Sequence, residues 1–409
     1  MTYELHVGDC RDIMGLLLAG ASVDSIVTDP PYGIRFMGQA WDGADIERTF
    51  KAANTDPARR ARSGHAAAAG KYDLTPESMR AFYEFTAAWA REALRVLKPG
   101  GHLLSFASTR TYHRMVCGIE DAGFEIRDQI GWVFGSGFPK SLDVSKAIDK
   151  EAGAAREVVG QRTRKNDRDA TSLKLGRVSD VFNLTAPATD AARQWQGWGT
   201  ALKPAWEPIV VARKPLAKGC TVAANVLAHG AGAINVDGCR VPGEERPVMV
   251  RTATVVAASS MAGASTGATS SGETTALGRW PANIIHDGSD EVLAAFPDGE
   301  GRFFYCAKAS KRDRNEGCEG LPARARDDWP QSLDGSDARG AAPSANHHPT
   351  VKPTDLMRYL CRLVTPPRGI VLDPFTGSGS TGKAALMEGF SFVGCELSAE
   401  YAEIAEARM

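Results

Sequence analysis

The sequence predicts an α/β fold in which helices cover a mostly parallel sheet. Apolar, strand-like segments alternate with segments of helical periodicity near both ends of the chain, and Gly or Pro residues separate them. Between these regions, residues 216–345 hold Gly, Ser, Thr and Pro turns without sustained periodicity, including the low-complexity run 252–276. We therefore expect an α/β domain built from both ends of the chain and interrupted by a loop-rich insertion.

The individual elements follow from apolar spacing and from the residues that end each run. Two prolines after Thr28 stop one strand, and Lys98-Pro99-Gly100-Gly101 ends a long helix. The patterns predict N-terminal strands over 3–7, 25–28, 102–106, 125–134 and 206–212, with helices over 11–18, 76–97 and 112–122. They predict C-terminal helices over 354–364 and 382–388, strands over 370–373 and 391–396, and a short last helix.

Three segments follow from this pattern: 1–215 and 346–409 as two halves of one domain, and 216–345 as the insertion. Residues 135–198 are expected to be irregular and rich in Lys and Arg, and 52–70 to form a loop over the site that the prolines mark. Two C-terminal strands cannot form a sheet alone. We therefore expect them to join the N-terminal strands.

Composition indicates a globular chain with no strong bias towards a partner. The hydrophobic fraction of 43% suits a large core, while 48 basic and 49 acidic residues nearly cancel. Any nucleic-acid surface must then be a local basic patch. No apolar run approaches the roughly 20 residues of a membrane span, and the N-terminus lacks a signal-peptide layout. We expect a cytoplasmic protein without a membrane partner, and eight reduced, structural cysteines, since no Cys-x-x-Cys pair occurs.

A glycine loop near the C-terminus predicts a nucleoside-containing cofactor. Gly377-Ser378-Gly379-Ser380-Thr381-Gly382 fits G-x-G-x-x-G between a strand and a helix, and Glu396 ends the next strand 19 residues after the first glycine. The glycines allow close backbone approach, and the acid can accept ribose hydroxyls. An ATPase phosphate loop is disfavoured, because Ala384 stands where the Mg²⁺-binding hydroxyl belongs.

The residue ahead of the glycines selects among such cofactors. Asp373 at the strand end would repel a pyrophosphate and attract a cation. S-adenosylmethionine carries an ammonium and a sulfonium beside a ribose, so it suits acids at two successive strand ends. Ligands of doubly wound sheets bind at the carboxyl ends of strands, which would bring Asp9, Asp29, Asp373 and Glu396 to one rim.

The corner Asp29-Pro30-Pro31-Tyr32 fits methyl transfer to an exocyclic amino group. The lone pair of such a nitrogen is delocalised into the ring, and hydrogen-bond acceptors can localise it. The carboxylate of Asp29 and a carbonyl fixed by the prolines, with Pro30 the natural candidate, can accept both N–H groups. Tyr32 offers a ring for stacking a base that has left the duplex. The simpler alternative is a stiff turn that ends a strand.

Together these motifs resemble the amino-group DNA methyltransferases in the permuted order called the β class, over most of 1–215 and 346–409. Thr28-Asp29-Pro30-Pro31-Tyr32 resembles the family's catalytic motif, and Asp373-Pro374-Phe375-Thr376-Gly377-Ser378-Gly379 resembles its cofactor loop. The segment 348–353, the turn 95–101 and Gly8-Asp9-Cys10 also resemble family segments. The resemblance implies a circularly permuted, Rossmann-like methyltransferase fold of seven strands with one antiparallel.

The resemblance also implies residue roles. Asp9 would hydrogen-bond the cofactor's adenine, Glu396 its ribose and Lys352 its carboxylate, with Phe375 packing against it. The cofactor-binding candidates are Asp9, Thr28, Lys352, Asp373, Phe375, Gly377, Gly379, Thr381 and Glu396, and the catalytic candidates are Asp29, Pro30, Pro31 and Tyr32. The expected reaction is methylation of adenine N6 in duplex DNA, with 216–345 as the target-recognition module.

Several alternatives stay open. Cytosine N4 methylation uses the same corner, although the family more often shows Ser in place of Asp29 for cytosine. A non-catalytic DNA-binding protein, or methylation of RNA or a protein amide, are further readings, the last more familiar with Asn in place of Asp29. A homodimer and a separate cognate endonuclease are compatible with the sequence.

Other candidate residues have simpler explanations. His347 and His348 as metal ligands lack a third ligand nearby, so no metal is expected. Aromatic residues 132, 134 and 138 could wall a base pocket but more often form core, and basic residues 162, 164, 165 and 168 could meet phosphates but more often form a solvated loop.

Overall fold

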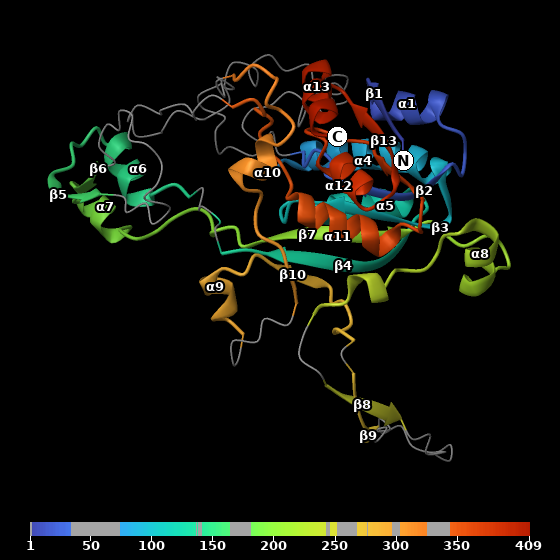
Figure 1. The fold of residues 1–409 in the computed structure, drawn as a ribbon. Helices are drawn as coiled ribbons and strands as arrows, with labels where there is room; N and C mark the ends of the chain where they lie inside the picture. The colour runs from blue at the N-terminus through green and yellow to red at the C-terminus, as the bar shows by residue number, and fades with distance from the viewer. Residues whose placement is uncertain are drawn as a thin grey trace. The chain divides into compact units, whose positions relative to one another are not determined.

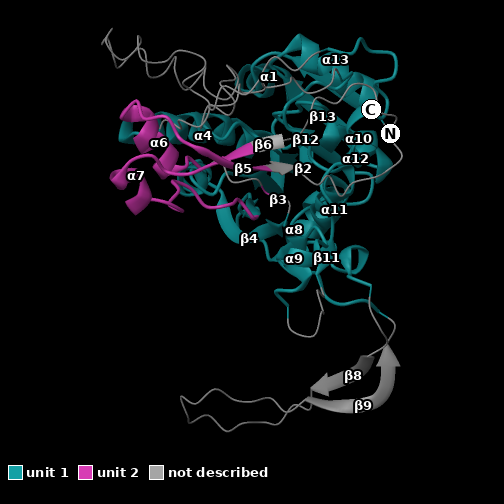
Figure 2. Cartoon of the chain, turned by 90° about the vertical axis from the view of Figure 1, so that its left-hand side faces the viewer, with its two compact units in different colours: residues 1–135, 206–409 teal, residues 136–205 magenta. Residues whose placement is uncertain are grey.

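The computed structural model describes residues 2–33, 74–135, 137, 141–163, 181–242, 246–251, 268–275, 277–296, 303–324 and 344–409. The expected loop over 52–70 and residues 138, 164, 165 and 168 lie outside these ranges. The chain divides into two compact units, residues 1–135 with 206–409 and residues 136–205 (Figure 2). Among the described helices, none is long and apolar enough to span a membrane.

A nine-stranded sheet forms the centre of the first unit, in the order β1-β13-β12-β2-β3-β7-β4-β10-β11. Only β7 runs antiparallel to its neighbours β3 and β4, which confirms the expected mostly parallel sheet with one antiparallel strand. The strands are β1 (Tyr3–Val7), β2 (Val23–Thr28), β3 (Leu97–Phe106), β4 (Glu125–Val133), β7 (Trp206–Arg213), β10 (Ile284–His286), β11 (Phe304–Tyr305), β12 (Ile370–Asp373) and β13 (Ser391–Glu396).

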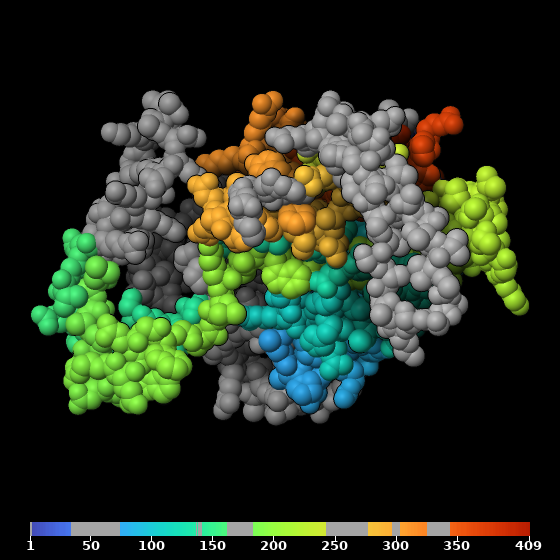
Figure 3. Space-filling view, turned by 90° about the horizontal axis from the view of Figure 1, so that it is seen from below, coloured from blue at the N-terminus to red at the C-terminus, as the bar shows by residue number. Residues whose placement is uncertain are grey.

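The expected count of seven strands is too low by two, because β10 and β11 extend the edge of the sheet next to β4. These strands have three and two residues, which is too short to show an alternating pattern. Both come from the insertion, and in Figure 3 the orange segment that contains them lies against teal residues from the first half of the chain.

Strands from the two ends of the chain interleave in the sheet. The C-terminal strands β12 and β13 lie between β1 and β2, with Val7 opposite Glu396 and Val371 opposite Ser25. The labelled chain ends accordingly lie close together (Figure 1). This arrangement confirms that the C-terminal strands need the N-terminal ones to complete a sheet.

Helices cover both faces of this sheet. One core contains residues of α1 (Cys10–Leu17), α4 (Pro76–Val96) and α5 (Tyr112–Asp121), and a second contains residues of α11 (Thr354–Val364) and α12 (Ser380–Met387). Ile26 belongs to the first core and its neighbour Val27 to the second, as expected for successive residues of a strand covered on both faces. The last helix, α13 (Ala399–Arg408), follows β13.

Capping residues set the ends of these helices. The hydroxyl of Thr75 accepts a hydrogen bond from the amide of Ser78, and Pro76 occupies the first turn of α4, where no intrahelical donor is needed. Asp9 caps α1 in the same manner by accepting from the amide of Arg11. The cap therefore fixes Asp9 directly after β1, at the edge of the sheet.

The insertion is more regular than expected. Its described elements include β8 (Arg246–Arg251), paired with β9 (Ala268–Thr275), and four short helices: α8 (Val222–His229), η4 (Asp237–Cys239), α9 (Asp290–Leu293) and α10 (Lys311–Asn315). None of these exceeds eight residues, and Gly, Ser and Thr turns lie between them, so no sustained apolar period marks them in the sequence. Its role in target recognition stays a prediction, as do the boundaries at 215 and 345.

The second unit corrects the expectation that 135–198 is irregular. It contains α6 (Val144–Glu151), β5 (Val158–Thr163), β6 (Val181–Thr185) and α7 (Asp190–Gln194), with β5 paired to β6. Asp149 accepts hydrogen bonds from the amides of Ala188 and Thr189 at 2.9 and 3.0 Å, and Arg156 lies 2.7 Å from it. These polar contacts of the buried Asp149 side chain join α6 to Arg156 and to the segment before α7.

Candidate functional site

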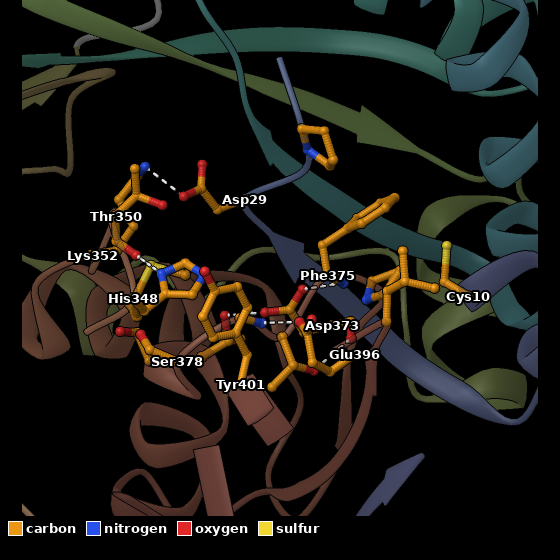
Figure 4. Close-up of a pocket in the computed structure, with 18 of the residues that line it drawn as sticks. Cys10, Asp29, His348, Thr350, Lys352, Asp373, Phe375, Ser378, Glu396 and Tyr401 are labelled. Atoms are coloured by element: carbon orange, nitrogen blue, oxygen red, sulfur yellow. Dashed lines mark hydrogen bonds and ion pairs between the residues drawn. The ribbon is translucent and has the colours of Figure 1, made fainter. Parts of the chain in front are cut away.

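The carboxyl ends of four parallel strands meet at one edge of the sheet. Asp9 follows β1, Asp29 follows β2, Asp373 ends β12 and Glu396 ends β13. A pocket opens at this edge, and all four acids line it (Figure 4). The structure thus brings together the four acids that the sequence assigned to one rim.

Two glycines of the cofactor loop have conformations that side chains resist. Gly377 has φ +53° and Gly379 has φ +77°. A Cβ on Gly377 would lie 3.0 Å from His348 Nε2, and one on Gly379 would lie 2.9 Å from the Cα of Ala405. Left-handed backbone and close neighbours both explain why the loop uses glycine at these positions.

Glu396 is held by the backbone on both sides of its carboxylate. Its Oε2 accepts from the amide of Gly377 at 2.7 Å, and its Oε1 accepts from the amide of Ser398 at 2.9 Å. Burial raises the pKa of this carboxyl, while the amide donors act to lower it. A carboxylate can accept about four hydrogen bonds, more than these amides supply, so it can still accept a hydroxyl from a ligand in the pocket.

Asp373 is almost fully buried and has three donors. Its Oδ1 accepts from the hydroxyl of Thr28 at 2.6 Å and the amide of Phe375 at 3.0 Å, and its Oδ2 accepts from the hydroxyl of Thr381 at 2.5 Å. Burial raises the pKa of Asp373 to about 6, although these hydrogen bonds act in the opposite direction. Thr28 and Thr381, both candidate cofactor residues, therefore fix the orientation of this acid.

The pocket has an aromatic wall. Phe375 packs against Phe85 and Trp89 of α4, with ring centres 6.1 and 5.6 Å apart, and both Phe85 and Phe375 line the pocket. Tyr401 of α13 lines another side and contacts the ring of His348 at 4.5 Å between centres. Flat apolar walls with acids between them suit a planar base attached to a sugar.

At the catalytic corner, the side chains of Asp29, Tyr32 and Lys352 contact one another. Tyr32 donates its hydroxyl hydrogen to Asp29 Oδ1 at 2.8 Å. Lys352 Nζ donates to Asp29 Oδ2 at 2.7 Å, as Figure 4 shows. Thr111 Oγ1 donates to the carbonyl of Tyr32 at 2.9 Å. Pro31 lines the pocket and Pro30 is buried. These contacts fix the corner through side chains of three separate segments.

Lys352 has two carboxylate partners that the sequence did not predict. Its ammonium is buried between Asp29 and Glu207, whose Oε2 lies 3.5 Å away, and it lies 3.3 Å from the hydroxyl of Tyr32. Burial acts to lower its pKa, but the two carboxylates outweigh burial and raise the pKa. Lys352 also lines the pocket, so contact with a cofactor carboxylate stays a prediction.

The remaining sequence candidates lie in other settings. Trp132 and Phe134 are both buried in the core, and Trp132 Nε1 donates to the carbonyl of Cys306 at 3.2 Å, so the simpler core interpretation is confirmed. His348 is buried, which lowers its pKa to about 3 and leaves it uncharged. Among the described residues, no cluster of three metal-ligating side chains occurs.

Comparison with known proteins gives the family. A family model described as DNA methylase matches residues 23–407. The chain belongs to this DNA methylase family. The resemblance noted for the sequence motifs is thereby confirmed.

Among relatives of this methylase, the type II methyltransferase M.HindIII of Haemophilus influenzae is 25% identical over 219 residues, 52% of this chain and 59% of that protein. The DNA adenine methyltransferase YhdJ of Escherichia coli is 40% identical over 63 residues, 15% of this chain and 21% of that protein. The chain thus spans less than two thirds of the length of these relatives. A solved structure titled PvuII DNA methyltransferase (cytosine-N4-specific) is 13% identical with a TM-score of 0.45, covering 100% of this chain and 86% of that one.

Three residues that shape the candidate site were not found from the sequence. Glu207 precedes the apolar part of β7, and Tyr401 lies in the last helix, with no motif around either. Arg408 is buried and donates to the carbonyl of Ser378 at 2.6 Å and to Ser380 Oγ at 3.1 Å, which fixes the cofactor loop. A charged residue one position from the end of the chain gave no signal of burial.

Proposed function

We propose that the chain is a DNA methyltransferase that transfers a methyl group from S-adenosylmethionine to N6 of an adenine flipped out of duplex DNA. One observation carries the proposal: Asp29 and Pro31 of the catalytic corner line the same pocket as the cofactor loop. These two segments are far apart in the sequence, and a hydrogen bond between Thr28 and Asp373, 345 residues apart, joins them. Membership of the DNA methylase family supports the reaction class.

The proposed division of labour follows the walls of the pocket. Asp9, Phe375 and Glu396 hold the adenosine part of the cofactor, and Asp373 faces its positive charge. The cofactor supplies an activated methyl group on sulfur. Asp29 accepts one N–H of the target amino group, so that the nitrogen lone pair is localised and aimed at that methyl group.

The charge balance of the transfer explains the acids at the corner. The nitrogen forms a bond to the methyl carbon while the bond from carbon to sulfur breaks, so positive charge moves from sulfur to nitrogen. The cofactor leaves as a neutral thioether, and the nitrogen then releases one proton to water. The carboxylate of Asp29 stabilises this arriving charge and accepts the hydrogen bond from the same N–H throughout.

Transfer of tritiated methyl groups from S-adenosylmethionine to unmethylated genomic DNA tests the proposal. We expect transfer by the unchanged protein and a loss of about 100-fold or more in Asp29→Ala, with cofactor binding retained. Asp12→Ala is a matched control, because Asp12 lies exposed on α1 away from the pocket and should leave transfer unchanged.

Nucleoside mass spectrometry identifies the product. N6-methyladenine supports the proposal, and the presence of Asp29 favours it, since the family more often has Ser at this position for cytosine. N4-methylcytosine would replace adenine by cytosine as the target. Absence of any transfer to DNA despite cofactor binding would contradict the proposal and indicate another substrate.

We further propose that the protein acts in the cytoplasm of a bacterial or phage-infected cell, with residues 216–345 contacting the target sequence. A homodimer and a separate endonuclease are partners to test by sedimentation of the purified protein and by co-purification. Loss of sequence preference after substitutions confined to 277–324, with cofactor affinity unchanged, is the result expected for a recognition module.

A further inference from the structure

Glu207 lies at the catalytic edge of the sheet because β7 runs antiparallel to its neighbours. The start of β7 therefore lies at the same edge as the ends of the parallel strands. The register agrees: Thr28 at the end of β2 is opposite Ser105, and Ile209, two residues after Glu207, is opposite Phe106. No motif identified from the sequence included this residue.

The ammonium of Lys352 faces two carboxylates at unequal distances. Its Nζ lies 2.7 Å from Asp29 Oδ2, within hydrogen-bond distance, and 3.5 Å from Glu207 Oε2. The aromatic rings of Phe106 and Tyr32 lie 4.7 and 5.7 Å from Nζ. The ammonium can therefore pass from one carboxylate to the other by a small movement of a flexible side chain, without leaving the cluster.

Glu207 Oε2 is buried, and its contact with Lys352 Nζ at 3.5 Å is longer and weaker than the 2.7 Å hydrogen bond of Asp29. A buried carboxylate oxygen without a short hydrogen bond is unfavourable and requires an explanation. Asp29 is in the opposite situation, because Tyr32 donates to its Oδ1 and Lys352 to its Oδ2. A target amino group that approaches Asp29 must compete with these donors.

We propose that Glu207 is a positioning residue, which takes the ammonium of Lys352 when the amino group of the target base donates to Asp29. This inference rests on the proposed methyl transfer. With the ammonium on Glu207, Asp29 Oδ2 is available to the incoming N–H group. Glu207 Oε2, which has only the longer contact with Lys352 in the present structure, is then the second position of the ammonium.

The charge of the cluster gives Glu207 a further effect. Glu207 adds one negative charge to the pair formed by Asp29 and Lys352. Positive charge arrives on the target nitrogen during transfer, so this added carboxylate favours the transition state over the ground state. Lys308, whose Nζ lies 3.6 Å from the centre of the Phe134 ring, is a second cation that interacts with Glu207.

Glu207→Gln removes the charge and retains the shape of the side chain. At saturating S-adenosylmethionine and DNA, kcat should fall about 10-fold to 100-fold, while both KM values stay within about twofold. Glu125→Gln is the matched control. Glu125 also pairs with a cation between β4 and β7, with Arg213 at 2.7 Å, but at the other end of these strands. Its kcat should be unchanged.

A double variant separates positioning from a structural role. In a Lys352→Met background no ammonium remains to be moved and only the charge effect of Glu207 is left, so adding Glu207→Gln should slow single-turnover methylation several-fold less than it does in the unchanged chain. Losses that multiply in the double variant would overturn the proposal, as would a Glu207→Gln protein with the kcat of the unchanged chain.

The same measurements distinguish this inference from the proposed function. If the unchanged protein transfers methyl groups to DNA and Glu207→Gln does so equally fast, only the role of Glu207 is wrong. If the unchanged protein binds S-adenosylmethionine but transfers nothing to DNA, the proposed function fails and the role of Glu207 fails with it. Thermal unfolding of each variant verifies that the fold is retained.

Discussion

Replacement of Thr381 by Val should destabilise the protein through Asp373. The Thr381 hydroxyl donates to Asp373 Oδ2 at 2.5 Å, and Asp373 is 1% exposed, so water cannot replace the lost donor. A hydrogen bond to a charged group contributes about 1.5–3 kcal/mol. Because Val has nearly the shape of Thr, packing is retained, and we expect the free energy of unfolding to fall by about 2 kcal/mol at pH 8.

The pH dependence has a definite sign. Burial raises the pKa of Asp373 from its usual 3.8 to about 6, so the folded state binds this proton more readily than the unfolded state. The contribution of this group to stability is therefore full below about pH 4 and is lost as the pH rises through about 6. Thr381→Val raises the pKa further, because a donor that favours the carboxylate is gone. The loss caused by the substitution should be smaller at pH 5, where Asp373 is mostly protonated.

Urea unfolding of the unchanged protein, Thr381→Val and Thr381→Ser at pH 5 and pH 8 measures this effect. The Ser variant keeps the hydroxyl and should lose much less stability than the Val variant at pH 8. Equal losses for Val and Ser, or a Val loss that is the same at both pH values, would refute the reasoning and assign the effect to packing.

Three further predictions concern the loop, the acid and the second unit. Gly377→Ala should reduce cofactor affinity about tenfold, measured by calorimetry, because φ is +53° and its Cβ would meet His348; unchanged affinity would contradict this. Affinity for S-adenosylmethionine should weaken below pH 6 as Asp373 becomes protonated, and a flat profile between pH 5 and 8 would exclude Asp373 as the acid that faces the positive charge. Arg156→Met should leave the buried carboxylate of Asp149 without its cation. Limited proteolysis should then cut within 136–205 faster, while cofactor affinity stays the same. Equal cleavage rates would show that this ion pair does not stabilise the second unit.

Elements with a clear apolar pattern and a marked end were predictable from the sequence, even short ones. β1 and α11 have the expected bounds, 3–7 and 354–364, because apolar spacing and flanking prolines or glycines defined them. One antiparallel strand was expected, but the pattern did not show that it is β7, because direction depends on how the connection returns to the sheet. The strands β10 and β11 were missed because three and two residues show no alternation, and the second unit was missed because its segment is rich in Lys and Arg rather than in apolar residues.

The site was predictable where motifs adjoin strand ends. The expectation that Asp9, Asp29, Asp373 and Glu396 share one edge depended only on parallel strands, and the pocket confirms it. The contacts of Lys352 were not predictable, because its partners Asp29 and Glu207 come from distant segments and depend on side-chain placement.

A crystal structure with a non-transferable analogue of S-adenosylmethionine tests the central claim most directly, namely that one pocket holds both the cofactor and the catalytic corner. The account predicts the analogue between Phe375 and Glu396, with the atom that replaces the transferred methyl group directed at the carboxylate of Asp29. An analogue bound in this pocket with that atom turned away from Asp29, or bound elsewhere, would contradict the account.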